Sequence, residues 1–216
     1  MNNLVSPSIA SGNHTWQTTI SKSKSFNGIG LHSGNLIKVN LKPGKENTGI
    51  IFVRSDIDKK IRERSIQALY SNVSDTSLCT TIENEYGIKV STIEHLMAAF
   101  NGTGIDNIII ELNGPEVPIM DGSSLPFIEI IEDCGIQSLK VKRKILKILK
   151  KIEVTVDNKS CSFTPSKDQK FSVEIDFENE AVGKQSASTS LTNYNFKNFA
   201  SNARTFGFMK DVEYMR

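Results

Sequence analysis

The segment from Ile105 to Leu112 constrains the fold of this chain more than any other segment. Its centre, Ile108-Ile109-Ile110, is apolar at consecutive positions, and consecutive residues of a strand point to opposite faces of a sheet. A strand that is apolar on both faces is typical of sheets that are covered on both sides, so we expect a covered inner strand. Strands followed by helices on such a pattern predict layered α+β architecture.

Two segments near this strand have the spacing of amphipathic helices. In each, apolar residues recur at i, i+3, i+4 and i+7, which places them on one stripe of a helix. The helix from Thr92 to Phe100 has the stripe Ile93, Leu96, Met97 and Phe100, with Asn101-Gly102 as its expected stop. The helix from about Leu125 has the stripe Phe127, Ile130, Ile131 and Cys134, with Ser124 as cap, Pro126 in the first turn and Gly135 after the end.

The remaining chain alternates between strand patterns and turns. Strands are expected at 17–26, 37–42, 49–53, 77–82, 171–177 and 185–191, and a helix at 194–203. The glycine-dense turn at 28–34 matches neither a dinucleotide fingerprint nor a phosphate-binding loop. It is either a tight hairpin loop or a loop that lines a ligand.

The basic stretch from Lys140 to Lys151 fits two patterns. A helix would align Ile145, Ile148, Leu149 and Ile152, whereas a strand would use Ile152, Val154 and Val156. A basic amphipathic helix would suit an anionic membrane surface, but a solvated strand or linker is the simpler interpretation of a charge run. We place a domain boundary here, with a poorly ordered lead-in at 1–15, a first α+β domain at 16–138 and a second at 139–216.

Composition excludes several classes of protein. The net charge of +2 gives no electrostatic case for nucleic acid. Three cysteines far apart in sequence form neither a disulfide framework nor a thiolate zinc site, which indicates a reducing compartment. No apolar run reaches the ~18 residues of a membrane span. We therefore expect a cytoplasmic protein without stable membrane anchoring.

Glu94-His95 is the pair in this chain most suggestive of chemistry. Consecutive helical residues point about 100° apart, so His95 lies roughly opposite the apolar stripe, beside the small Ala98 and Ala99. That helix would be packed on both sides, and a buried imidazole there needs a polar partner. Glu94 and Ser91 fit a capping box, with His95 a hydrogen-bonded core residue. The alternative is a zinc ligand at His95 and a general base at Glu94.

Six strings, in order along the chain, carry a family resemblance. They are Gly28-Ile29-Gly30-Leu31-His32-Ser33-Gly34, Leu78-Cys79-Thr80-Thr81, Ser91-Thr92-Ile93-Glu94-His95-Leu96, Gly104-Ile105-Asp106-Asn107, Pro118-Ile119-Met120-Asp121-Gly122-Ser123 and Ala203-Arg204-Thr205-Phe206-Gly207-Phe208-Met209. Together they resemble the UDP-3-O-acyl-N-acetylglucosamine deacetylases, the zinc amidases that commit Gram-negative bacteria to lipid A synthesis. The resemblance runs from about Gln17 to Arg216.

The resemblance implies a fold and an activity. The fold would be two similar α+β domains, each a β-sheet packed with two helices, with the helix layers facing each other. The reaction would be zinc-dependent hydrolysis of the N-acetyl group of UDP-3-O-acyl-N-acetylglucosamine. His95 would be a Zn²⁺ ligand, Glu94 the general base, and Thr205 a group that stabilises the oxyanion.

Further roles follow from the same resemblance. Phe206 would lie near the substrate and its acyl passage, and Asp211 would support the active site. Leu31 and His32 would line the substrate end of the cleft. The small-molecule substrate would be the partner of a monomeric enzyme.

One departure from the family pattern limits this expectation. The family's other zinc ligands come from a His-x-x-x-Asp motif after the arginine-threonine-phenylalanine run, and a further histidine follows. Here no histidine follows His95, and the other two are His14 and His32. We therefore expect an incomplete second domain, ending inside a helix that opens at Asp211, and an inactive chain. The alternative is a non-catalytic fragment or degenerate paralogue that binds a sugar nucleotide or a partner protein.

Overall fold

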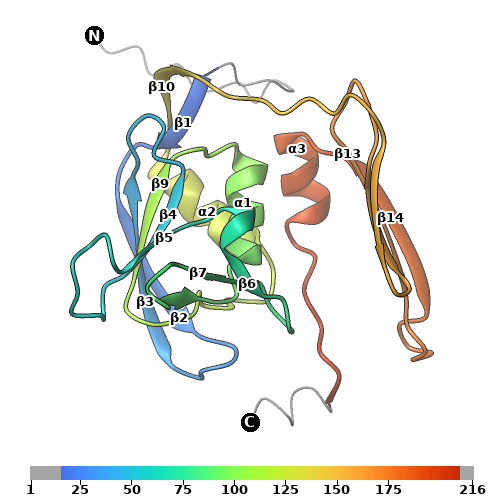
Figure 1. Ribbon diagram of the computed structural model, residues 1–216, viewed down its shortest axis with the longest axis horizontal. Coiled ribbons are helices and arrows are strands. Elements are labelled where there is room, and N and C mark those ends of the chain that lie inside the picture. The colour runs from blue at the N-terminus through green and yellow to red at the C-terminus, as the bar shows by residue number, and fades with distance from the viewer. Residues whose placement is uncertain (1–15, 210–216) are drawn as a thin grey trace.

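The computed structural model describes residues 16–209, and its mixture of sheets and helices confirms the α+β class (Figure 1). The elements are β1 (Trp16–Ile20), β2 (Lys24–Ile29), β3 (Leu36–Pro43), β4 (Ile50–Arg54), β5 (Ser65–Gln67), η1 (Tyr70–Asn72), β6 (Val73–Asp75), β7 (Thr81–Glu83), β8 (Lys89–Val90), α1 (Glu94–Thr103), β9 (Ile108–Leu112), α2 (Leu125–Cys134), β10 (Ile136–Lys142), β11 (Ile152–Val156), β12 (Lys159–Phe163), β13 (Lys170–Asp176), β14 (Lys184–Ser190), α3 (Asn193–Asn195) and η2 (Phe196–Ala200). The predicted lead-in at 1–15 and the predicted helix from Asp211 lie outside the described residues.

The strand β9 lies at the centre of the largest sheet, whose order is β2-β3-β9-β4-β5. It pairs antiparallel with β3 and parallel with β4, so the predicted inner position is confirmed. Ile108 and Ile110 are fully buried, whereas Ile109 is only half-buried. The expectation of cover on both faces was therefore wrong. The helices cover one face, and the other is open, with the Lys42 and Glu111 side chains 2.6 Å apart on it.

The helices α1 and α2 pack on the covered face and supply much of the core. Their buried side chains are Leu96, Ala99 and Phe100 from α1 and Phe127, Ile128, Ile131 and Cys134 from α2. The helix α1 continues past the expected stop, because Gly102 stays helical and Gly104 takes the left-handed conformation, with φ 79°. Pro126 and Gly135 stand at the two ends of α2 as predicted, but the Ser124 side chain makes no cap.

One expected strand needs correction, and the simpler interpretation of the basic stretch, a solvated strand or linker, is confirmed. The strand predicted at 17–26 is two strands, because the chain bends at 21–23: β1 pairs with the distant β10, and β2 pairs with β3. The basic stretch is not a helix, since β10 occupies its beginning and residues 143–151 have no regular structure. The proposed domain boundary after residue 138 falls within β10, and the division itself stays a prediction.

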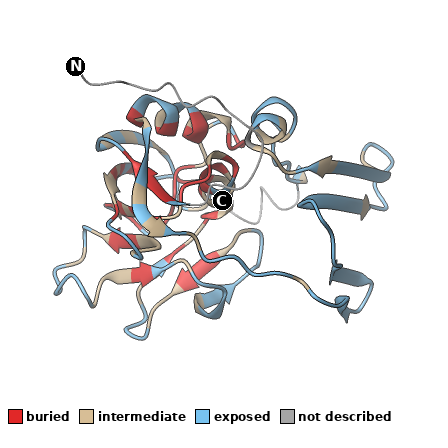
Figure 2. Ribbon diagram, turned by 90° about the horizontal axis from the view of Figure 1, so that it is seen from above, coloured by how far each residue is buried: buried red, intermediate tan, exposed pale blue. Residues whose placement is uncertain are grey.

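The second half of the chain adds little to the core. All buried large apolar side chains in the described part lie between Ile20 and Cys134, and Figure 2 shows them gathered on one side of the molecule. β11–β12 and β13–β14 form two separate hairpins. Phe171 and Phe177 are exposed, while Ile175 is half-buried. The duplication of one domain into two stays a prediction.

The helical segment formed by α3 and η2 connects the two halves. In Figure 1 it stands between α1 and α2 on one side and the β13–β14 hairpin on the other. The Ser201 carbonyl accepts hydrogen bonds from the Ser124 amide and hydroxyl, both at 3.1 Å. Lys197 Nζ lies 2.6 Å from a carboxylate oxygen of Glu132 in α2. The helical segment therefore contacts α2, while the facing of two helix layers stays a prediction. No helix within 16–209 is long and apolar enough to cross a membrane.

Candidate functional site

The Glu94-His95 pair opens α1, and both residues are half-buried. The carboxylate of Glu94 accepts a hydrogen bond from the Thr80 amide at 3.0 Å. The capping-box alternative is therefore wrong: Ile93 precedes the helix without a side-chain cap, and the Ser91 amide donates to the Pro115 carbonyl at 2.8 Å. Glu94 is held by a loop outside its own helix.

Two residues beside these contacts, and one further along the loop after Pro115, have left-handed backbones. Leu78, Thr92 and Met120 have φ values of 60°, 56° and 55°. Such a conformation costs a residue with a side chain ~1–2 kcal/mol. Backbone strain of this kind gathers at functional sites, where the surrounding structure holds it in place. Residue types gave no sign of it, since none of the three is Gly, Asn or Asp.

The glycine turn at 28–34 is a hairpin loop that joins β2 to β3. The Gly30 amide donates to the Asn35 carbonyl at 2.9 Å and closes the loop. Leu31 is exposed, and His32 is half-buried. The buried Nε2 atom of His32 has no hydrogen-bond partner among residues 16–209. The hairpin interpretation is confirmed, and the ligand-lining alternative stays a prediction.

Glu116 is a site residue that sequence reasoning missed. Its side chain is almost fully buried, and its two oxygens accept hydrogen bonds from the amides of His32 and Ser33 at 2.9 and 3.0 Å. The Thr92 hydroxyl donates a third bond at 3.1 Å. Glu116 thus joins the glycine loop to the residue two positions before Glu94. Only its position next to Pro115 in a turn-rich loop is visible in the sequence, and that pattern gives no signal of burial.

Thr205 contacts the far end of the segment 116–122, the segment that begins with Glu116. Its amide donates to the Gly122 carbonyl at 2.9 Å, and Arg204 lies 3.5 Å from the Asp121 carboxylate. The hydrogen bond from the Ser123 hydroxyl lowers the pKa of Asp121, and the Arg204 charge adds to this, against a smaller opposing effect of burial. Asp121 is therefore an anion beside Thr205 at neutral pH.

Within residues 16–209, the site residues predicted from sequence lie in three places. Leu31, His32 and the Glu94-His95 pair are linked through Glu116 and Thr92. Thr205 is linked to the other end of the same 116–122 segment. Phe206 instead packs with Phe177 and Phe208 in a ring cluster. No hydrogen bond or ion pair within 16–209 joins Thr205 or Phe206 to the Glu94-His95 pair, and Asp211 lies outside the described residues.

The described residues do not make a catalytic zinc centre. Such centres take three protein ligands and leave a position for water. No group of three or more His, Cys, Asp or Glu side chains within 16–209 could hold a metal ion. His95 is half-buried beside Glu94, so the pair supplies one imidazole and one carboxylate to this region.

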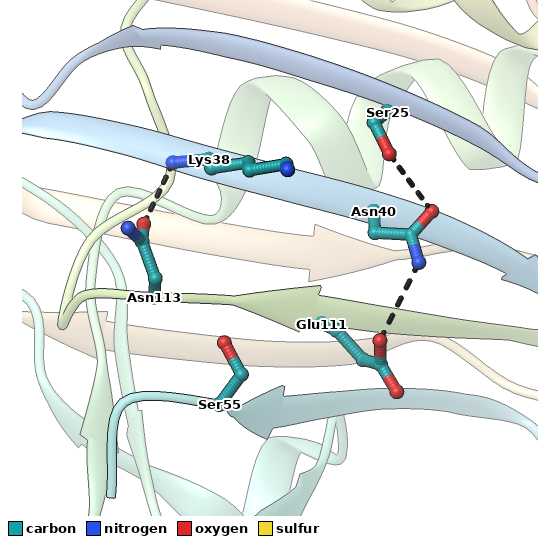
Figure 3. A pocket seen from close by; sticks show the side chains of 6 residues that line it. All are labelled: Ser25, Lys38, Asn40, Ser55, Glu111 and Asn113. Carbon is teal, nitrogen blue, oxygen red and sulfur yellow. Dashed lines mark hydrogen bonds between the residues drawn. The ribbon is translucent and has the colours of Figure 1, made fainter.

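A polar hollow of about 280 Å³ lies on the open face of the large sheet, away from α1 (Figure 3). Its side chains bond to one another: Ser25 to Asn40, Asn40 to Glu111, and Asn113 to the Lys38 amide. Ligand pockets are mostly apolar, whereas this hollow is lined by polar side chains on an open sheet face. It is therefore a poorer candidate for the functional site than the region around Glu94.

Known proteins that are similar to this chain match one family model and share one name. A family model described as "LpxC: UDP-3-O-acyl N-acetylglycosamine deacetylase" matches residues 17–216. The chain is 42% identical over 203 residues to the UDP-3-O-acyl-N-acetylglucosamine deacetylase of Pasteurella multocida (strain Pm70), which covers 93% of the chain and 65% of that protein. For the protein of that name from Myxococcus xanthus (strain DK1622) the identity is 43% over 200 residues, with 93% and 62% covered. For that from Neisseria meningitidis (strain FAM18) it is 43% over 202 residues, with 93% and 66% covered. The chain therefore spans just under two thirds of the length of these relatives.

Proposed function

Because this chain belongs to the UDP-3-O-acyl N-acetylglycosamine deacetylase family, we propose that its site serves the deacetylation of UDP-3-O-acyl-N-acetylglucosamine. The observation that carries the proposal is the Glu94 carboxylate, held by the Thr80 amide and followed by His95 at the opening of α1. A base must be fixed within reach of its proton, and this bond fixes one oxygen. The other oxygen accepts no hydrogen bond from residues 16–209. The reaction class is hydrolysis of an amide.

The proposed reaction breaks the bond between the acetyl carbon and the sugar nitrogen. A water oxygen attacks the acetyl carbonyl carbon, and the carboxylate of Glu94 takes the proton that the water gives up. Glu94 passes this proton to the sugar nitrogen, the C–N bond breaks, and the nitrogen leaves as a free amine. The second product is acetic acid, which loses its proton to water as acetate. Thr205 donates to the oxygen that becomes negatively charged, the task of an oxyanion hole. Asp211 supports this arrangement in the proposal.

Substrate binding falls to the other predicted residues. Leu31 and His32 line the sugar-nucleotide end, at the tip of the β2–β3 loop. Phe206 lies along the acyl chain, and its exposed ring suits an apolar ligand. We further propose that the protein works as a cytoplasmic monomer, without binding nucleic acid and without a stable membrane anchor.

His95 is the one residue of this chain that we propose as a zinc ligand. A catalytic zinc needs three protein ligands, and the chain has no histidine after His95. We therefore propose that the 216-residue chain by itself neither retains zinc nor deacetylates the substrate. The experiment measures zinc content and acetate release on the purified chain, with His95→Gln as variant and His14→Gln as matched control.

The expected result is no turnover and less than one zinc per chain in all three proteins. One bound zinc that is lost in His95→Gln but kept in His14→Gln, together with turnover, would contradict the proposed inactivity and confirm the ligand. Failure of the unmodified chain to bind UDP-3-O-acyl-N-acetylglucosamine in a titration would instead contradict the proposed substrate.

A second candidate function rests on the lack of a metal-binding group among residues 16–209. The chain would then bind a sugar nucleotide or a partner protein without catalysing a reaction. Binding of UDP as tightly as of the full substrate would favour this function, because a deacetylase site also contacts the sugar and the acyl chain.

A further inference from the structure

Glu116 brings together two parts of the candidate site that are distant in sequence. One oxygen of its carboxylate accepts from the His32 amide and the Thr92 hydroxyl, and the other accepts from the Ser33 amide. The backbone at Glu116 also pairs with Ser91 in a parallel bridge. A single buried side chain thus contacts the loop at 30–34 and the turn that leads into α1.

The fit of this carboxylate leaves no spare room. A side-chain carbon added at Gly30 would lie 2.4 Å from Glu116 Oε2. A carbon added at Gly28 would lie 2.8 Å from Pro118 Cβ, in the same segment as Glu116. Glycine at these two positions allows the loop backbone to approach the segment 116–120 closely. The glycine-dense turn therefore leaves the space that the Glu116 side chain occupies.

A carboxylate suits the three donors around Glu116. It offers acceptor sites on both oxygens and carries no hydrogen of its own. A carboxamide of the same shape would direct an N–H toward one of the donors, and bonds from N–H groups to a charged acceptor are the stronger ones. No ion pair joins Glu116 to a cation within residues 16–209, so the three hydrogen bonds explain why this acid is buried.

We propose that Glu116 is a positioning residue. It holds the loop that carries Leu31 and His32 in a fixed position relative to the Glu94-His95 pair. The hydrogen bond to Thr92 acts on a residue whose left-handed backbone sets the direction in which the chain enters α1. The functional half of this inference rests on the proposed function, since it assigns Leu31 and His32 to the substrate. The hydrogen bonds themselves do not depend on that assignment.

The test combines amide exchange with substrate binding on the full 216-residue chain. In Glu116→Gln the His32 and Ser33 amides should exchange about tenfold faster, because each loses a charge-assisted bond. Affinity for UDP-3-O-acyl-N-acetylglucosamine should fall about tenfold through the cost of ordering the loop. Glu111→Gln is the matched control, because it makes the same change in a carboxylate paired with Lys42 on the open face of the sheet.

A second pair of variants keeps the proposal testable if Glu116→Gln does not fold. Thr92→Val removes only the hydroxyl bond and should speed exchange at 32–33 by a smaller factor. Thr92→Ser retains the hydroxyl and should behave as the unmodified chain, a rescue that a change in packing alone would not produce.

Unchanged exchange at His32 and Ser33 in Glu116→Gln and in Thr92→Val would overturn the proposal. Faster exchange with full substrate affinity would overturn its functional half. Absence of binding by the unmodified chain would contradict the proposed function instead, and the exchange rates would still decide whether Glu116 holds the loop.

Discussion

At the residue scale, the site is held by contacts that offset backbone strain. Thr92 is left-handed, and its hydroxyl is bonded to Glu116. Leu78 is left-handed, and two residues later the Thr80 amide is bonded to Glu94. Each such residue costs ~1–2 kcal/mol, so the neighbouring hydrogen bonds must keep the backbone from relaxing. The Thr80 amide therefore holds the Glu94 carboxylate, and the bond between Thr92 and Glu116 holds the backbone two residues before Glu94.

Replacing Leu78 by glycine should release this strain. Leu78 is 58% exposed, so little packing is lost. We expect Leu78→Gly to raise the free energy of unfolding by up to about 1 kcal/mol, because the relief of ~1–2 kcal/mol exceeds the ~0.5–1 kcal/mol entropic cost of glycine. Urea unfolding measures the change. Leu69→Gly is the control, since Leu69 is 49% exposed and has an ordinary φ of −111°. This variant should lower the free energy of unfolding. Equal losses in both variants would contradict strain at Leu78.

The predictability of site residues depended on whether their chemistry was visible locally. Glu94 and His95 stood out because they interrupt an apolar helix. Glu116 did not, because a carboxylate in a loop beside Pro115 is normally solvated, and its burial arises from segments distant in sequence. The capping box failed for the same reason: the Ser91 backbone was already paired with the chain at 115–117.

At the element scale, strands with clear alternation were predicted and short or bent ones were not. The patterns at 37–42 and 171–177 correspond to β3 and β13. β5 and β8 have three and two residues, too few to show a period. The prediction of one strand over 17–26 failed because the chain bends at residues 21–23. The bend follows from the pairing of β1 with β10, which is distant in sequence and leaves no local signal.

The end of α2 offers a test of local opening through its cysteine. Cys134 is buried, and burial raises the pKa of its thiol, so less reactive thiolate is present at a given pH. Cys161 in β12 is exposed, and Cys79 is half-buried. We expect a thiol reagent to modify Cys161 first, Cys79 next, and Cys134 at least about a hundredfold more slowly than Cys161, because α2 must open.

Mass spectrometry of the labelled peptides measures the three rates. Ile131→Ala should speed labelling of Cys134 and leave Cys161 unchanged, because loss of a core isoleucine costs ~2–5 kcal/mol of packing. Similar rates at Cys134 and Cys161 in the unmodified chain would show that α2 does not pack as described.

At the scale of the whole molecule, one core supports two unequal halves. The buried apolar side chains lie between Ile20 and Cys134, and the two hairpins beyond them are largely exposed (Figure 2). The helical segment 193–200 therefore connects the second half to the first chiefly through its contacts with α1 and α2. The ion pair between Lys197 and Glu132 adds little, since both side chains are 42% exposed and such pairs contribute ~0–1 kcal/mol. The ring of Phe196 also packs against Gly102 of α1.

A double-mutant cycle on this contact measures the coupling of the two halves. A carbon added at Gly102 would lie 2.0 Å from Phe196 Cδ1, so Gly102→Ala should destabilise the chain by about 1–3 kcal/mol despite the better helix propensity of alanine. With Phe196→Ala the obstacle is gone, and Gly102→Ala should then be neutral or stabilising by up to about 1 kcal/mol. The interaction free energy, obtained from urea unfolding of the four proteins, should exceed the ~0.5 kcal/mol within which independent sites add. Phe199, 70% exposed on the same helical segment, is the control, and Phe199→Ala should leave the effect of Gly102→Ala unchanged. Additive effects for Gly102 and Phe196 would mean that residues 193–200 do not pack on α1 in solution, and that the two halves move independently.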